Sequence, residues 1–217
     1  MSDGVNHAVL EEGIEPPEMD AVRRRRVARF GMWVFMASEL LFFGGLLFAY
    51  AHGRLSAPAG FAEAGRQVDV LLGTVNTGVL LTSSLCVALA VEAASHAQRR
   101  LAPRFLWAAV ALGCVFLAIK GFEYRKDWLE GLVPGPRFAL KTPGAQTFFM
   151  LYFTATLLHA VHMVVGIGAL ALYAWNARDA GSDWLRSSRL ETVGLYWHFV
   201  DVVWLGLYPL LYLVGRP

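Results

Sequence analysis

Residues 196–205 read Tyr196-Trp197-His198-Phe199-Val200-Asp201-Val202-Val203-Trp204-Leu205, inside an apolar run over residues 193–214. About 20 residues in helical conformation are enough to cross a bilayer, so this run is predicted to be a transmembrane helix. His198 and Asp201 stand three residues apart within it and therefore point the same way from the helix. An ionisable group at membrane depth is costly unless it faces protein and has a partner. The question for the rest of the chain is therefore what these two side chains face.

The amino-acid composition is that of an integral membrane protein. Of the 217 residues, 56% are hydrophobic and 17% are charged, whereas soluble domains have about 45–50% and about 25%. The apolar residues form five blocks, at residues 30–51, 70–94, 101–122, 146–175 and 193–214. Each block is long enough to span the bilayer as a helix. We predict an all-α fold, a polytopic membrane bundle of five transmembrane helices, over residues 30–217.

The third block is the weakest of the five, since its uncharged core covers only residues 105–119. Lys120 follows this core and is predicted to snorkel outward to the membrane surface. Glu123 stands three residues later, so a local ion pair with Lys120 is expected at the interface. Residues 121–145 contain three prolines with glycines between them and are predicted to form a turn-rich surface loop.

The N-terminal segment is polar, acidic at first and then basic. Residues 1–29 are predicted to be a disordered cytoplasmic tail without a cleavable signal peptide. Five arginines, Arg23–Arg26 and Arg29, precede the first apolar block. Such a cluster favours a cytoplasmic N-terminus, and five helices then put the C-terminus on the opposite side. The cytoplasmic side would hold eleven of the 19 lysines and arginines, which is a modest excess.

The remaining composition excludes several classes of function. The net charge is +2, and the basic residues flank apolar blocks rather than forming one patch, so no nucleic-acid partner is predicted. Cys86 and Cys114 lie in apolar blocks and are predicted to be buried, reduced thiols. No nucleophilic triad, phosphate-binding loop or dinucleotide fingerprint is present, so no catalytic residue is assigned.

Polar residues occur inside the first two blocks. Ser38 and Glu39 lie in the middle of the first, where a carboxylate requires either a proton or a buried partner. Glu39 is interpreted as a protonatable group or lipid-head anchor, with a structural hydrogen bond as an equal alternative. The glycines that follow, at positions 44 and 45, allow close approach by a helix or a lipid chain. In the second block two pairs share faces and are expected to form interhelical hydrogen bonds: Asn76 with Ser83, and Thr77 with Ser84.

Three histidines raise the question of a metal site. His159 and His162 lie deep in the fourth block and His198 lies in the fifth, so three imidazoles could in principle surround an ion. The fifth block is crowded by aromatic residues: Tyr196, Trp197 and Trp204. There is also no cysteine ligand motif and no acidic ligand set. We therefore predict hydrogen-bonded structural histidines and no metal. In the second block, Glu92 and His96 are four residues apart and are expected to pair with each other or with Arg99.

Five segments, in order along the chain, resemble a known membrane-protein family. They are Gly31-Met32-Trp33-Val34-Phe35 leading into Ser38-Glu39; Val75-Asn76-Thr77 followed by Ser83-Ser84; Gly113 and Phe116 with Glu123-Tyr124; Phe148-Phe149 with Thr156, His159, His162 and Gly166; and residues 196–204. Together they are similar to subunit III of the haem–copper terminal oxidases, the family of cytochrome c oxidase and the bacterial quinol oxidases. Lys120 departs from the family's usual Gln, Leu157 from its Gly, and Glu92 with Ser95-His96 from a frequent His-His pair. The mitochondrial form has seven helices, so this chain resembles the short, five-helix bacterial form.

The resemblance implies a non-catalytic subunit of an oxygen-reducing, proton-translocating enzyme of aerobic respiration. Such a subunit binds no haem or copper, which belong to partner subunits, and it holds structural phospholipid. The implied partners are subunit I above all, subunit II, a small subunit IV and membrane lipid. The implied location is the bacterial inner membrane, with a cytoplasmic N-terminus and a periplasmic C-terminus. The resemblance further implies that the subunit supports proton uptake.

Two groups of site residues follow from these considerations. The candidates for lipid binding or protonation are Glu39, Glu123, His159, His162, His198 and Asp201. The candidates for structural hydrogen bonding and packing are Ser38, Asn76, Thr77, Ser83, Tyr196, Trp197 and Trp204. The alternatives are the five-helix accessory subunit of a nitric oxide reductase, a haem-binding membrane anchor and a proton-coupled carrier. A carrier usually needs paired broken helices, and no such pair is evident. The electron donor and the haem type stay open.

Overall fold

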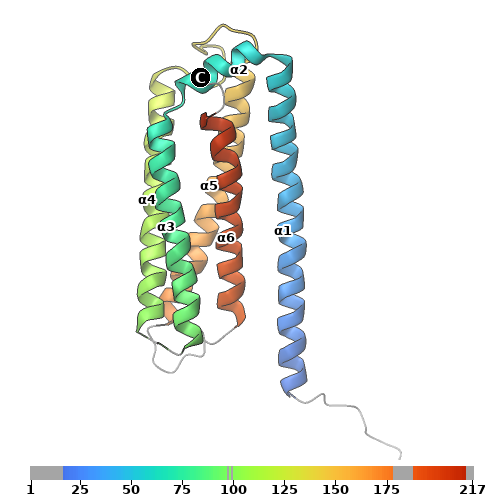
Figure 1. Ribbon diagram of the computed structural model, residues 1–217, viewed down its shortest axis with the longest axis vertical. Helices are drawn as coiled ribbons and strands as arrows, with labels where there is room; N and C mark the ends of the chain where they lie inside the picture. The colour runs from blue at the N-terminus through green and yellow to red at the C-terminus, as the bar shows by residue number, and fades with distance from the viewer. Residues whose placement is uncertain (1–16, 97, 99, 178–187, 214–217) are drawn as a thin grey trace, which may run out of the picture.

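The computed structural model shows an all-helical chain and describes residues 17–96, 98, 100–177 and 188–213 (Figure 1). Its elements are α1 (Pro17–Ser56), α2 (Pro58–Gln67), α3 (Val70–Ser95), α4 (Leu101–Leu129), α5 (Ala145–Asn176), α6 (Ser188–Tyr208) and the π-helical turn η1 (Pro209–Leu213). Helices α3, α4, α5 and α6 form one bundle, and α1 stands beside it against α5 and α6 (Figure 1). The short α2 lies across one end of the bundle (Figure 1).

Four helical segments have the length and composition to cross a membrane: Arg29–Ser56, Val70–Ser95, Leu101–Leu129 and Ala145–Asn176. They correspond to the first four predicted blocks and confirm the all-helical class. Helix α6, which carries the fifth block, runs alongside them (Figure 1) but is not among these four segments. The number of five spanning helices therefore stays a prediction.

The ends of several elements differ from the predicted boundaries. Helix α1 begins at Pro17, so the tail expected to be disordered through residue 29 is helical from Pro17 onward. Proline suits a first helical position, and arginine, which follows in a cluster, has a high intrinsic helix propensity. Residues 1–16 of that tail lie outside the described part. Helix α4 continues to Leu129, so the first nine residues of the predicted loop 121–145 are helical.

The sequence analysis missed α2, which lies in the connection between the first two blocks. Pro58 begins this helix, and its apolar face buries Phe61 and Ala64. Gly60 packs against the turn that precedes α5, where an added Cβ would lie 2.1 Å from the carbonyl oxygen of Pro143. Only glycine fits such a close backbone approach. Helix α2 is therefore held down on the end of the bundle.

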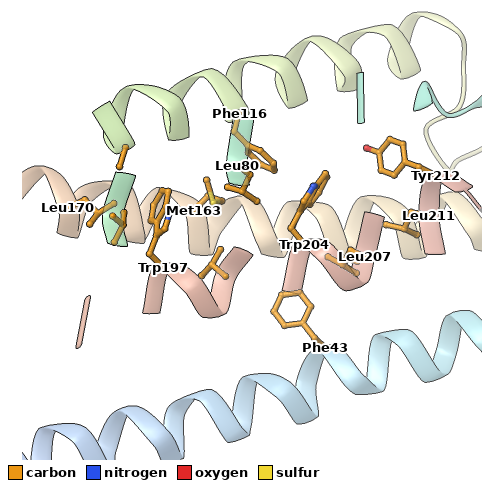
Figure 2. Close-up of a cluster of buried hydrophobic side chains, with 14 of the residues drawn as sticks. Phe43, Leu80, Phe116, Met163, Leu170, Trp197, Trp204, Leu207, Leu211 and Tyr212 are labelled. Carbon is orange, nitrogen blue, oxygen red and sulfur yellow. The ribbon is translucent and has the colours of Figure 1, made fainter. Parts of the chain in front are cut away.

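Trp197 and Trp204, from residues 196–205, lie in the middle of the buried cluster (Figure 2). Trp197 is fully buried, and its ring lies against two glycines of neighbouring helices: a Cβ at Gly113 or Gly166 would come within 3.0 or 2.9 Å of it. Trp204 is also fully buried and packs edge-on against Phe116, with ring centroids 4.9 Å apart. These large rings account for the close fit of α4, α5 and α6.

Hydrogen bonds join the helices where the sequence predicted them. Asn76 donates to the carbonyl oxygen of Phe116 at 3.3 Å, and Ser83 donates to that of Ala109 at 3.1 Å. Trp204 Nε1 donates to the Thr77 hydroxyl at 3.0 Å. Ser38 instead donates within its own helix, to the carbonyl oxygen of Phe35 at 2.7 Å.

The two cysteines are free thiols. Cys86 is partly buried, but Cys114 is exposed on the outside of α4, so its predicted burial within the chain is wrong. The helix turns Gly113 and Phe116 toward the core and leaves Cys114 and Val115 facing away from it.

Asp69 fixes the start of α3. Its Oδ1 accepts from the backbone N–H of Leu72 at 3.2 Å, and its Oδ2 accepts from Lys126 Nζ at 3.0 Å. The bond from Lys126, and secondarily that from Leu72, lowers the pKa of Asp69 below its ordinary value of 3.8. The residue therefore joins the beginning of α3 to the end of α4.

The variant Asp69→Asn should lose about 0.2–1 kcal/mol at neutral pH, because asparagine still caps the helix but cannot pair with Lys126. The pKa is lower in the folded state than in the unfolded state. The stabilisation is therefore complete above the unfolded pKa and disappears as the pH falls through the folded one. Unfolding midpoints in detergent should differ at neutral pH and converge in strong acid. Equal midpoints at neutral pH would show that the ion pair contributes nothing.

Candidate functional site

The predicted polar residues gather in three places within the described structure. Glu39 and His162 meet between α1 and α5. Ser84, His198 and Asp201 lie between α3 and α6. Lys120 and Glu123 form a buried cluster with tyrosines of α5 and η1.

The Glu39–His162 pair connects α1 to the bundle. His162 Nε2 lies 3.2 Å from Glu39 Oε2, and the two side chains are 15% and 20% exposed. Phe43 packs on the imidazole with ring centroids 5.7 Å apart, and Tyr196 donates to the carbonyl oxygen of His162 at 3.0 Å. The buried partner that a membrane carboxylate requires is therefore His162, on a helix that the sequence alone could not select.

The geometry of this pair fixes how many protons it carries. His162 Nδ1 lies 2.8 Å from the carbonyl oxygen of Leu158, and a carbonyl can only accept, so Nδ1 bears a hydrogen. In a neutral His162, Nε2 would then carry no hydrogen and would face an ionised carboxylate oxygen of Glu39, so that two acceptors would be in contact. The contact is favourable only if one proton lies between them, on the carboxyl group or on the imidazole. Glu39 thus has the buried partner that the sequence gave as one of two alternatives, and it shares one proton with that partner.

Helix α1 is the least covered of the four apolar helices. Only 6% of its apolar segment is buried, compared with 33% in each of α3, α4 and α5. A Cβ at Gly44 or Gly45 would meet nothing within 4 Å, so no described helix makes the close approach that these glycines permit. Large apolar side chains cover the free face of α1: Trp33, Leu40, Leu41, Phe42 and Phe48. In a membrane, this apolar face is covered either by lipid or by another protein.

The second group confirms that His198 and Asp201 point the same way. Ser84 Oγ lies 2.7 Å from His198 Nδ1, and Asp201 Oδ2 lies 4.0 Å from the same nitrogen. The Asp201 side chain is 4% exposed, and neither carboxylate oxygen is hydrogen-bonded to a described residue. The serine and the aspartate both face Nδ1, so this is not the relay arrangement of a hydrolase, in which they bind opposite nitrogens.

His159 and His162 diverge although they lie on one helix. Residues three apart differ by about 60° around a helix, so His162 faces α1 whereas His159 enters the core. His159 is 1% exposed, between Phe116 and Trp204, and its nitrogens have no described partner. No three His, Cys, Asp or Glu side chains converge in the part of the chain that is described. The three histidines occupy separate settings and do not fit a metal, and the absence of a metal remains a prediction.

Lys120 does not snorkel outward, so that prediction is wrong. Its side chain is 5% exposed and points into the bundle, where Nζ donates to Glu123 Oε2 at 3.0 Å. It also donates to the hydroxyls of Tyr152 at 3.1 Å and Tyr212 at 2.7 Å. Four aromatic rings lie within 4.7–5.6 Å of the ammonium: Tyr124, Tyr152, Trp204 and Tyr212. Three hydrogen bonds and these rings replace the water that an outward position would supply.

Four long apolar helices, with charged side chains paired between and within them, are the features of a multi-pass membrane protein. The chain matches the family model "Cytochrome c oxidase subunit III" over residues 18–216, and it belongs to that family. This confirms the resemblance drawn from the five segments.

Three relatives illustrate the match. Cytochrome c oxidase subunit 3 of Thermostichus vulcanus is 30% identical over 187 residues, which cover 86% of this chain and 87% of the relative. The subunit 3 of Corynebacterium diphtheriae is 26% identical over 201 residues, covering 92% and 94%. The heme-copper oxidase subunit I+III of Aeropyrum pernix is 32% identical over 194 residues, covering 86% of this chain and 22% of that longer protein.

Proposed function

We propose that this chain is the non-catalytic subunit III of a proton-pumping haem–copper oxidase in a bacterial inner membrane, with its N-terminus in the cytoplasm. It stabilises subunit I, binds phospholipid and supports proton uptake, while haem and copper reside in partner subunits. Family membership supports the assignment. The Aeropyrum relative, named subunit I+III, supports subunit I as the main partner.

The Glu39–His162 pair is the observation that carries this proposal. It holds one proton, and it is partly exposed beside the uncovered apolar face of α1. A proton carrier at such a place can exchange with groups outside the bundle, and a charged lipid head group can hydrogen-bond to it. His198, which is 38% exposed beside Ser84, offers a second such contact on α6. Asp201 lies on the buried side of His198, with its Oδ2 4.0 Å from His198 Nδ1.

Co-purification tests the assignment to the complex. The tagged chain, extracted in mild detergent, should bring with it a larger polytopic protein that carries haem and copper and reduces oxygen. A partner that reduces nitric oxide instead would support the alternative, that this chain is the accessory subunit of a nitric oxide reductase. A stable monomer with its own haem spectrum would contradict the subunit assignment.

The role of Glu39 is tested within the intact complex. Glu39→Ala removes a partly buried hydrogen bond to an ionisable group, which is worth about 1.5–3 kcal/mol and holds α1 in place. The initial rate of oxygen consumption should stay close to that of the wild type, whereas the number of turnovers before inactivation should fall. The measurement is an oxygen-electrode trace followed to exhaustion of activity.

The matched control is Glu92→Ala. Glu92 pairs with His96 at 2.7 Å, but both side chains are more than 60% exposed and belong to the end of one helix. That variant should keep the wild-type working life, because an exposed pair contributes little. Immediate and complete loss of oxygen reduction in Glu39→Ala would instead assign a catalytic role to Glu39.

A further inference from the structure

The cluster around Lys120 contains a second carboxyl group that the ion pair does not use. Asp127 lies one helical turn after Glu123 on the buried face of α4, and the two residues are 4% and 1% exposed. Oδ2 of Asp127 and Oε1 of Glu123 are both buried, and neither accepts a hydrogen bond from any described residue. Buried carboxylate oxygens without donors are costly, so these two oxygens require an explanation.

The hydrogen bonds define the charges of Lys120 and Glu123. Lys120 Nζ donates to three oxygens, and only an ammonium has three hydrogens to donate. The Tyr212 hydroxyl accepts from Lys120 and donates to Glu123 Oε2 at 3.0 Å. Glu123 Oε2 thus accepts from two donors, as an ionised carboxylate oxygen does. The positive charge of Lys120 is therefore already balanced by Glu123.

An ionised Asp127 would give this buried cluster a net negative charge. The charged groups that act on Asp127 include Lys120, Glu123 and Glu130, of which two are acidic. Lys126, the residue before Asp127, is bonded to Asp69 at the start of α3. The other groups that face the cluster are neutral phenols bonded to Lys120: Tyr212 of η1, and Tyr152 of α5, which is also hydrogen-bonded to Asp127. An uncompensated charge in such a setting costs several kcal/mol.

We propose that Asp127 is a proton-binding site that holds one proton as a neutral carboxylic acid in the working protein. A proton on Oδ2 makes the cluster electrically neutral. It also supplies a donor that can turn toward Glu123 Oε1, so that one hydrogen satisfies both unpaired oxygens. Release of that proton to water leaves a carboxylate that can replace Glu123 beside Lys120. Asp127 is thus a reserve counter-ion, separate from the Glu39–His162 pair.

Infrared difference spectroscopy of the purified complex tests this assignment. The spectrum of Asp127→Asn subtracted from that of the wild type should show one carboxylic-acid carbonyl band that shifts in D₂O. The matched control is Glu130→Gln on the exposed end of α4, which should remove a carboxylate band instead. Loss of a carboxylate band in Asp127→Asn would overturn the proposal.

A second variant tests the charge balance independently. In Lys120→Met the positive charge is absent, so Glu123 should also take up a proton and a second carboxylic-acid band should appear. Lys120→Gln, which keeps hydrogen bonding without the charge, should show the same gain. If neither variant gains such a band, the cluster tolerates a net negative charge. The proposal that Asp127 holds a proton would then be wrong.

Discussion

The double variant Glu123→Gln/Asp127→Asn should lose about 3–5 kcal/mol of stability, more than the sum of its two single variants. Either single variant leaves one carboxyl group able to balance Lys120. In Glu123→Gln, Asp127 gives up its proton and becomes the counter-ion, and in Asp127→Asn the existing ion pair is unchanged. Only the double variant leaves the ammonium buried at 5% exposure with no carboxylate beside it.

The control is the triple variant that adds Lys120→Met. Replacing a whole buried ion pair with neutral groups is often nearly neutral, so this change should recover most of the loss. Chemical unfolding of the purified chain in detergent, followed by circular dichroism, gives the four stabilities that the cycle requires. Additive effects of the two single variants would show that Asp127 does not compensate for Glu123.

The apolar blocks predicted the long helices because a membrane span is a local property of composition. The partners of buried charges are not local. Lys120 was expected at the surface because a lone lysine at a helix end usually extends to water, but Tyr152 and Tyr212 lie 32 and 92 residues away in sequence. Glu39 was expected to need a proton or a partner, yet only the packing of α1 on α5 shows that the partner is His162.

Short elements and helix faces escaped prediction for related reasons. Helix α2 has ten residues between turn formers, too few for a periodic apolar pattern to stand out. The sequence analysis weighed His159 and His162 together, as histidines of one helix that could in principle surround a metal ion with His198. In the structure the two histidines contact different elements. His162 packs against Phe43 of α1, whereas His159 packs against Phe116 of α4. A shared face was correctly predicted for His198 and Asp201, since both face Ser84 and the single helix α3.

The variant Trp204→Ala should lose about 3–5 kcal/mol of stability, the usual cost of truncating a fully buried aromatic ring. Trp204 packs between Phe116 and His159, with ring centroids at 4.9 and 5.1 Å, and its N–H is bonded to Thr77 of α3. Trp204 thus contacts each of the other three helices of the bundle. Its loss would leave a cavity in the middle of that core (Figure 2).

Two further variants separate packing from the hydrogen bond. Trp204→Phe keeps most of the ring volume and loses mainly the bond to Thr77, so it should cost about 1 kcal/mol from that bond plus a smaller cavity term. Trp128→Ala, at a tryptophan that is 70% exposed, should stay within about 0.5 kcal/mol of the wild type. Unfolding midpoints in detergent rank the three variants. Removal of a fully enclosed indole should disturb the packing of all four helices. If Trp204→Ala lost as little stability as Trp128→Ala, Trp204 would not form part of the core of the bundle.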